Sequence, residues 1–184
     1  MYAIISELDP EASLVVKDLW NKLREACNLM AIYELPTPHL TWLTAEELDV
    51  TAVERFLADL SNNTQPLTSF IFGFGIFSGD RPVFYMPLVK SQAMIDLHKE
   101  IWRQSTGLIK NENRYYSPNF WLPHITLAIN DITKESLACA LKAVAFETVE
   151  MQVIFNNLLV VSQQDLPANM ANKRFQLSDK GVKS

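Results

Sequence analysis

The chain has 184 residues, of which 48% are hydrophobic and 20% are charged, a balance typical of a globular protein. Its formal net charge of −5 argues against a protein that grips long nucleic acid through a basic face. The longest apolar stretch is interrupted by Gly73 and Gly75, and the first ten residues lack the pattern of a secretory signal, so we expect a cytoplasmic protein with no membrane span.

The first part of the chain predicts alternating strands and helices. An apolar, partly β-branched run over 2–8 fits a strand, and Asp9-Pro10 then supplies an N-cap and a proline at the first helical position. Apolar residues recur at helical spacing over 15–30. Further on, Thr51-x-x-Glu54 has the pattern of a capping box that opens a second helix.

The middle and the end of the chain continue this alternation. Apolar runs over 67–77 and 82–89 are joined by Ser78-Gly79-Asp80-Arg81 and predict a β-hairpin. Ser91 is the expected N-cap of the next helix, and Asp131 that of a helix reaching Val144. A polar loop separates these two helices, and strands are expected near 148–155, 158–162 and 173–178. The similar order of elements in the two halves predicts a pseudo-symmetric α+β protein, with residues 1–184 forming a single domain of two sheet-and-helix lobes.

Cys27 and Cys139 lie in helix-like segments, with no CxxC spacing and no cluster of further ligands. We therefore expect two reduced, partly buried thiols and neither a disulfide nor a metal site.

One motif occurs twice, as PHLTW at 38–42 and as PHITL at 123–127, in a chain with three histidines. Because side chains alternate along a strand, His39 and Thr41 point to one face, and His124 and Thr126 do the same in the second motif. The residues expected to face the core are Leu40, Trp42, Ile125 and Leu127.

A histidine and a threonine on one face suit an anionic substrate. Imidazole can give or accept a proton near neutral pH, and a threonine hydroxyl can donate to a phosphate oxygen. Two such pairs facing each other would supply one acid, one base and two donors around a single phosphorus atom. His39 and His124 are therefore the candidate acid and base, and Thr41 and Thr126 the candidate phosphate ligands, with no metal or other cofactor expected.

Other interpretations of the motif fit less well. A single histidine on a strand is most often structural, but two matching motifs argue against that. A zinc site would need a third ligand, and threonine is a poor one. No GxSxG sequence supports a serine nucleophile. His98, beside the buried stripe of a helix, is expected to be structural.

With these paired motifs the chain resembles the 2H phosphoesterase superfamily, and within it the branch named for bacterial 2′-5′ RNA ligases. The resemblance implies a bilobal α+β fold in which two antiparallel sheets face a central cleft, with helices packed outside. It implies metal-independent hydrolysis of a 2′,3′-cyclic phosphate or a related 2′-5′ phosphodiester. By analogy His39 is the acid and His124 the base, although the two roles could be exchanged. The expected partner is a nucleotide or RNA end with a cyclic phosphate, bound by a monomer.

The chain departs from the family pattern at one position. Ile129 stands where many RNA-ligase-like members have an arginine after the second motif, which argues against ligase activity. Arg81 and Arg114 are candidates to replace that phosphate contact, and Tyr116 is a candidate to stack on a base. Trp121 is expected in the core. The alternative to an enzyme is a nucleotide- or RNA-end-binding module that keeps the cleft without turnover.

Overall fold

The computed structural model describes residues 1–35, 37–162 and 173–178. The α-helices in this part of the chain are α1 (Pro10–Cys27), α2 (Val50–Asn62), α3 (Gln92–Ser105) and α4 (Lys134–Val144), with short 3₁₀ helices η1 (Ala31–Glu34) and η2 (Arg114–Tyr116). The strands are β1 (Tyr2–Glu7), β2 (His39–Leu48), β3 (Leu67–Ile71), β4 (Gly75–Phe77), β5 (Val83–Pro87), β6 (Ile109–Glu112), β7 (His124–Ala128), β8 (Met151–Phe155), β9 (Asn157–Ser162) and β10 (Arg174–Gln176).

The strands form two antiparallel sheets, which confirms the predicted α+β class. The larger sheet has the order β10-β9-β1-β2-β7-β5-β4, with β6 added beside β2, and the smaller one pairs β3 with β8. The strands that carry the two motifs, β2 and β7, are joined by the single pair Leu40–Ile125. The motifs therefore meet in the middle of one sheet, at the point where its two halves are least connected.

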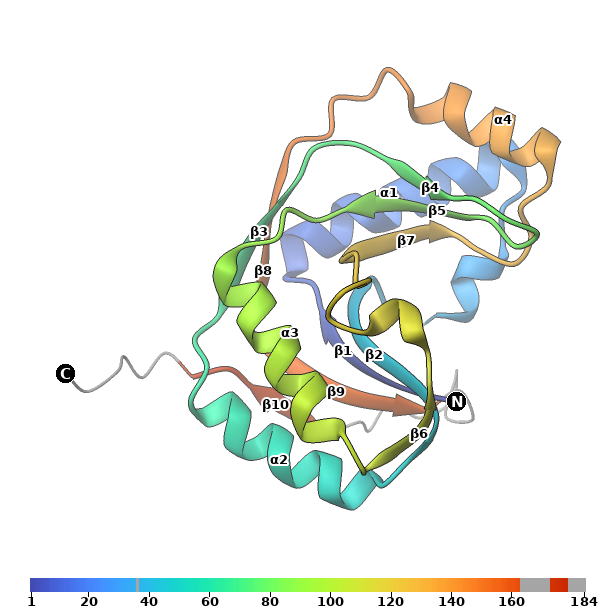
Figure 1. Cartoon of the computed structure of the whole chain (residues 1–184). Coiled ribbons are helices and arrows are strands. Elements are labelled where there is room, and N and C mark those ends of the chain that lie inside the picture. Colours follow the sequence, from blue (N-terminus) through green and yellow to red (C-terminus); the bar gives the residue numbers. More distant parts are fainter. Residues whose placement is uncertain (36, 163–172, 179–184) are drawn as a thin grey trace.

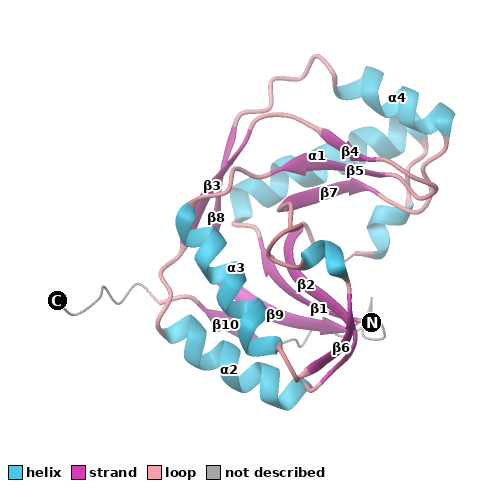
Figure 2. Cartoon of the chain, in the orientation of Figure 1, coloured by secondary structure: helices cyan, strands magenta, loops and turns pink. Residues whose placement is uncertain are grey.

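Helices cover the two halves of the large sheet separately (Figures 1 and 2). α1 packs against β7, and α4 lies beside α1, so β4, β5 and β7 with these two helices form an upper lobe. α2 packs against β9 and β10, and α3 against β2, which forms a lower lobe with β1. The boundary between the lobes runs between β2 and β7.

Helix N-caps confirm some predictions and correct others. Asp9 caps α1, with Pro10 in its first turn, and Ser91 caps α3. The predicted capping box at Thr51 is wrong, because α2 begins earlier and Asp49 accepts from its first turn.

The prediction that Asp131 is the N-cap of the last helix is also wrong. α4 starts at a capping box formed by Thr133 and Ser136. One carboxylate oxygen of Asp131 instead accepts hydrogen bonds from the backbone N–H groups of Met30 and Ala31, at 2.5 and 2.7 Å. Asp131 therefore ties the segment after β7 to the start of η1.

The predicted hairpin exists only in part. β4 pairs with β5, but β3 turns away to pair with β8 and meets the end of β5 through the bridge Ile71–Leu88. The loop before the second motif also contains structure that the sequence pattern did not reveal, since β6 pairs with the far end of β2 and η2 follows it.

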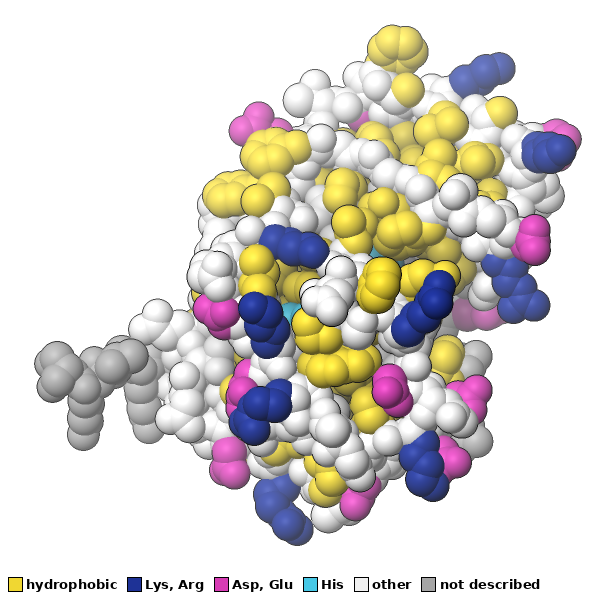
Figure 3. Space-filling view, viewed as in Figure 1, with side chains coloured by type: hydrophobic (Ala, Val, Ile, Leu, Met, Phe, Trp, Pro, Cys, Tyr) yellow, Lys and Arg dark blue, Asp and Glu magenta, His cyan; other side chains and the backbone are white. Residues whose placement is uncertain are grey.

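The core confirms the alternation predicted for both motifs, since the four residues expected to be inward are fully buried: Leu40, Trp42, Ile125 and Leu127. Trp121 is also buried, as predicted. Some hydrophobic side chains reach the surface, including the stacked pair Phe70 and Phe72. In the space-filling view, hydrophobic side chains extend over the middle of this face and Lys and Arg project around them, whereas only small areas of histidine are visible (Figure 3). Within the described residues, no helix is both long and apolar enough to cross a membrane.

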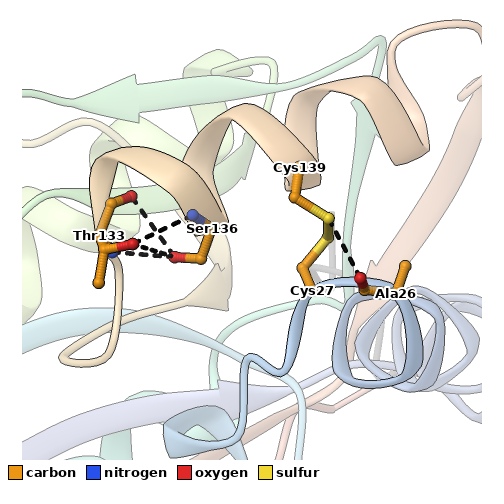
Figure 4. The surroundings of a disulfide bond; sticks show 5 residues. All are labelled: Ala26, Cys27, Thr133, Ser136 and Cys139. Carbon is orange, nitrogen blue, oxygen red and sulfur yellow. Dashed lines mark hydrogen bonds between the residues drawn. A yellow bond between two sulfur atoms is a disulfide. The ribbon is translucent and has the colours of Figure 1, made fainter.

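The two cysteines form a disulfide, so the prediction of two thiols is wrong. Cys27 ends α1 and Cys139 lies in the middle of α4, with Cα atoms 5.7 Å apart (Figure 4). The residues are 112 positions apart in sequence, so their spacing gave no sign of a pair that depends on two helices packing side by side. The bond fastens α4 to α1 on the outside of the upper lobe.

Candidate active site

The two motifs meet through the pairing of β2 with β7. Leu40 and Ile125 are partners in an antiparallel pair and both point into the core. This register sets His39 across from Thr126 and Thr41 across from His124, and all four side chains point away from that core. The expected set of two imidazoles and two hydroxyls is thus brought together on one face of the sheet.

Both imidazoles are held by the same local hydrogen bond. Nδ1 of His39 lies 2.8 Å from the carbonyl oxygen of Thr37, and Nδ1 of His124 lies 2.7 Å from that of Leu122. A carbonyl oxygen only accepts, so each Nδ1 carries the proton and each neutral ring keeps a free electron pair on Nε2. Nε2 is therefore the nitrogen of each ring that is left to accept a proton.

Burial lowers the pKa of both histidines below the ordinary value of 6.5. Desolvation is the main cause for each, and the hydrogen bond from Nδ1 to the carbonyl partly opposes it. The charge of a protonated His124 lowers the pKa of His39 further, as expected for two imidazoles that lie close together. Both rings are therefore mainly neutral at pH 7 in the free protein.

His124 is surrounded by aromatic side chains from the β4–β5 hairpin. Its ring centroid lies 4.9 Å from that of Phe77, nearly perpendicular to it, and 5.2 Å from that of Tyr85. Phe77 and Tyr85 stack on each other with centroids 4.1 Å apart. Tyr85 passes over Gly75, where a Cβ atom would come within 2.6 Å of the tyrosine ring, so only glycine allows this ring position.

A cleft of about 700 Å³ opens beside the motifs. His39, Thr41 and Thr126 line it, whereas His124 lies on the same strand as Thr126 without lining it. The other walls come from the N-terminal strand, η1, the end of β7 and the end of β9, and include Tyr2, Ile5, Met30, Tyr33, Glu34, Leu35, Ile129, Asn130 and Val161. Most of this wall is apolar or aromatic.

Tyr116 is the predicted substrate residue that the structure brings to the motifs. It lines the cleft together with Thr41, and the Thr41 side chain is close enough to its phenol to oppose part of the pKa rise that burial causes. Burial raises the pKa of Tyr116 above its ordinary value, so the phenol stays protonated near neutral pH. Its assignment as a base-stacking residue stays a prediction.

The two arginine candidates are elsewhere on the surface. Arg81 is exposed in the turn between β4 and β5, and Arg114 is exposed with its guanidinium over the ring of Tyr115. Neither is among the residues that line the cleft, whereas Ile129 is. Their assignment as phosphate ligands stays a prediction, since neither side chain lines the cleft.

His98 is buried behind the site and packs against the core. Its ring stacks on Trp121 with centroids 3.9 Å apart and an angle of 3° between the planes, and Nε2 lies 2.9 Å from the carbonyl oxygen of Tyr116. Desolvation lowers the pKa of His98 to about 4, so this ring is neutral at physiological pH. The three histidines thus divide into two near the cleft and one that supports the core.

Two groups of residues near the site carry no signal in the sequence. Phe77 and Tyr85 could have been placed beside His124 only from the register that pairs Tyr85 with Thr126. Trp20 falls within the predicted first helix, and its indole N–H reaches the carbonyl of Thr126 at 3.0 Å. No local pattern marks either contact, because both depend on tertiary packing.

Across the described residues, no group of three histidine, cysteine or acidic side chains is arranged to hold a metal ion.

Comparison with known proteins identifies the family. A model of the 2′-5′ RNA ligase superfamily matches residues 10–165. A protein named "Putative phosphoesterase" from Bacillus licheniformis is 29% identical over 99 residues, which are 52% of this chain and 54% of that protein, so the chain aligns with about half the length of this relative.

Two solved structures share the fold at low sequence identity. TT0787 of Thermus thermophilus aligns with a TM-score of 0.60 at 15% identity, over 96% of this chain and 97% of that one. Usb1 of Kluyveromyces marxianus aligns with a TM-score of 0.52 at 9% identity, over the same shares of the two chains. Since the family model covers most of its length and the paired motifs meet on one face, this chain belongs to the 2′-5′ RNA ligase superfamily, as its resemblance to the 2H phosphoesterases predicts.

Proposed function

We propose that this protein is a phosphodiesterase that hydrolyses 2′,3′-cyclic phosphates, or related 2′-5′ phosphodiesters, without a metal ion. The observation that carries the proposal is the meeting of His39, Thr41, His124 and Thr126 around the pair Leu40–Ile125. Family membership supports phosphodiester chemistry in general. The choice of a cyclic phosphate rests on the acid–base set, because opening such a ring needs one proton removed from water and one delivered to a ribose oxygen.

In the proposed reaction, His124 accepts a proton from water through Nε2 while the water oxygen attacks phosphorus. The bond from phosphorus to one ribose oxygen breaks, and His39 donates the proton on its Nε2 to that oxygen. The product is a phosphomonoester, and the proton gained by His124 balances the one lost by His39. The roles of the two histidines can be exchanged without changing this balance.

The threonines would bind the non-bridging phosphate oxygens. Thr41 and Thr126 each offer one hydroxyl donor to an oxygen whose negative charge strengthens the hydrogen bond. Tyr116 would complete the site from the Thr41 side and offer a ring to a nucleobase. Arg81 and Arg114 remain candidates for contacts with a longer substrate outside the cleft.

We propose that the substrate is a small cyclic nucleotide or the end of an RNA, that a monomer acts on it, and that it acts in the cytoplasm. Ligation is not part of the proposal.

Hydrolysis of 2′,3′-cyclic AMP by His39→Ala and His124→Ala tests the proposal. We expect each substitution to lower kcat by about 10²- to 10⁴-fold, with the far-UV circular dichroism spectrum unchanged. EDTA should leave the wild-type rate unchanged. A double variant that turns over substrate at the wild-type rate would contradict the proposal. Thermal stabilisation by a panel of cyclic phosphates and 2′-5′-linked dinucleotides, with no product from any of them, would favour a binding module instead.

A further inference from the structure

The backbone carbonyls of both motif threonines accept hydrogen bonds from tryptophan. Nε1 of Trp20, on α1, donates to the carbonyl oxygen of Thr126 at 3.0 Å. Nε1 of Trp121, in the loop before β7, donates to the carbonyl oxygen of Thr41 at 3.1 Å. Trp20 precedes the first motif and contacts Thr126 of the second motif. Trp121 precedes the second motif and contacts Thr41 of the first.

These hydrogen bonds lie beside the boundary between β2 and β7, where the pairing of strands is sparse, although Thr41 pairs with Ile5 of β1 and Thr126 with Tyr85 of β5 on their other sides. β2 and β7 are joined by the single pair Leu40–Ile125, so no regular ladder between the two strands fixes their spacing at the threonines. Threonine is β-branched and its χ1 angle is restricted, so the direction of its hydroxyl follows the orientation of its own backbone. A donor that fixes the carbonyl of Thr41 or Thr126 therefore also restricts the direction of the hydroxyl on the same residue.

The donors are themselves rigid. Trp20 and Trp121 are only 4% and 3% exposed. The ring of Trp121 stacks on His98 and also on Trp42, with centroids 5.3 Å apart in the second pair. Trp20 makes an edge contact with Tyr33, which lines the cleft. The packing of these rings leaves little freedom for the indole N–H groups to follow a moving carbonyl.

We propose that Trp20 and Trp121 are positioning residues for the hydrolysis proposed above, and the inference rests on that function. Each indole N–H fixes the backbone of one phosphate-binding threonine and so aims its hydroxyl at the phosphate. Burial of two large rings would stabilise the core whatever their N–H groups contacted. The N–H groups of both rings nevertheless reach the same backbone atom of the two motif threonines.

A third buried tryptophan provides a matched control. Nε1 of Trp42 donates to Oγ of Ser6 at 2.7 Å, deep in the core and on the opposite face of β2 from Thr41. The loss of this N–H also removes a buried hydrogen bond from an indole, with a side-chain hydroxyl as the acceptor. It leaves the carbonyls of both motif threonines with their donors.

The test replaces one tryptophan at a time with 3-benzothienylalanine, which keeps the shape of the ring and has sulfur in place of N–H. At positions 20 and 121 we expect kcat for 2′,3′-cyclic AMP to fall about 5- to 50-fold, because a small misplacement of a binding group lowers the rate strongly. At position 42 we expect less than a twofold change in kcat, with a comparable loss of thermal stability. The pH of maximal kcat/KM should stay the same in all three variants, since none of the three indoles bonds an imidazole. Ser6→Ala is a second control without an unnatural residue, which removes the partner of Trp42 together with the hydrogen bond from Ser6 Oγ to the carbonyl of Asn157.

A titration with inorganic phosphate separates this inference from the proposed function. The methyl signals of Thr41 and Thr126 would be followed by NMR as phosphate is added to the wild type and to the three variants. Weaker phosphate binding at positions 20 and 121 only, in a protein without turnover, would support positioning and contradict the proposed hydrolysis. Wild-type kcat and phosphate affinity in the variants at 20 and 121 would overturn the inference, and so would equal losses in all three variants. A wild-type protein that neither turns over substrate nor binds phosphate would overturn both proposals.

Discussion

The two motif strands carry the same residues in different surroundings. β2 has ten residues and pairs with β1 over residues 39–45 and with β6 at its far end. β7 has five residues and depends on β5, which itself belongs to a short hairpin. In both strands Nδ1 of the histidine bonds to the carbonyl two residues earlier, so the local geometry of the imidazole does not need the longer strand.

The supports behind the two motifs also differ. His124 is surrounded by Phe77 and Tyr85, whereas Tyr116 lies beside Thr41 in the first motif. The upper lobe, which carries β7, has the disulfide on its outer side. The same histidine–threonine pattern is thus held on two unequal strands, each of which is supported by its own set of neighbouring residues.

The largest effect is expected from the disulfide. Replacing Cys27 and Cys139 with serine should lower the free energy of unfolding by about 2–4 kcal/mol, because the bond closes a long loop in the unfolded chain. Urea denaturation measures this change. Hydrogen exchange should show more loss of protection in β5 and β7 than in β1 and β2, because α4 is fastened to the upper lobe.

The serine variant also controls for reagent effects, since dithiothreitol should destabilise the wild type and leave the variant unchanged. Equal loss of protection in both lobes would show that the bond does not support the upper lobe in particular. An unchanged urea midpoint on reduction would contradict the stabilising role of the bond.

A smaller effect is expected from the threonine hydroxyls. Thr41→Val and Thr126→Val should each lower kcat/KM by about 10- to 150-fold, the equivalent of about 1.5–3 kcal/mol for a hydrogen bond to a charged group.

Tyr116→Phe should lower kcat/KM less than either threonine substitution. Because its phenol interacts with the Thr41 side chain, its effect should depend on Thr41 and be additive with Thr126→Val to within about 0.5 kcal/mol.

Tyr115→Phe is the matched control for Tyr116→Phe. Tyr115 is the adjacent residue, its ring is exposed, and its hydroxyl faces Arg114 at 3.5 Å and not the motifs. Its rate should stay within twofold of the wild type. If the effect of Tyr116→Phe on kcat/KM depends on Thr126 and not on Thr41, the assignment of Tyr116 to the first motif is contradicted.

Sequence patterns predicted the parts of this molecule that depend on local periodicity. Alternation along a strand placed Leu40 and Ile125 in the core and the motif histidines on the opposite face, because a strand has only two faces. The N-cap at Asp9 followed from a local hydrogen bond and the proline after it. Such features need no knowledge of the partner strand.

The features that sequence patterns missed depend on contacts between distant segments. The disulfide needs α1 to pack beside α4, and Tyr85 reaches His124 only through the register of β5 with β7. Asp131 is an acceptable N-cap residue by composition, but it binds the N–H groups at the start of η1, about 100 residues earlier in the chain. Each of these requires the tertiary fold before any single residue can be assigned.

The smallest effect is expected in the pH dependence of hydrolysis, which reports the protonation of His39 and His124. Hydrolysis needs one imidazole protonated and the other neutral, and the population of that form is greatest midway between the two apparent pKa values of the pair. Desolvation lowers both pKa values below 6.5, so kcat/KM should be maximal below pH 6.5 and fall as the pH rises through 7. A bound phosphate anion favours the protonated form, so the maximum of kcat should lie at higher pH than that of kcat/KM.

NMR titration of the imidazole Cε1–H signals measures the pKa values of His39 and His124 separately. In His124→Ala the pKa of His39 should rise, because the charge that lowers it is gone. An unchanged His39 titration in that variant would mean that the two rings act without sensing each other, and a maximum of kcat/KM above pH 7 would contradict the burial of the pair.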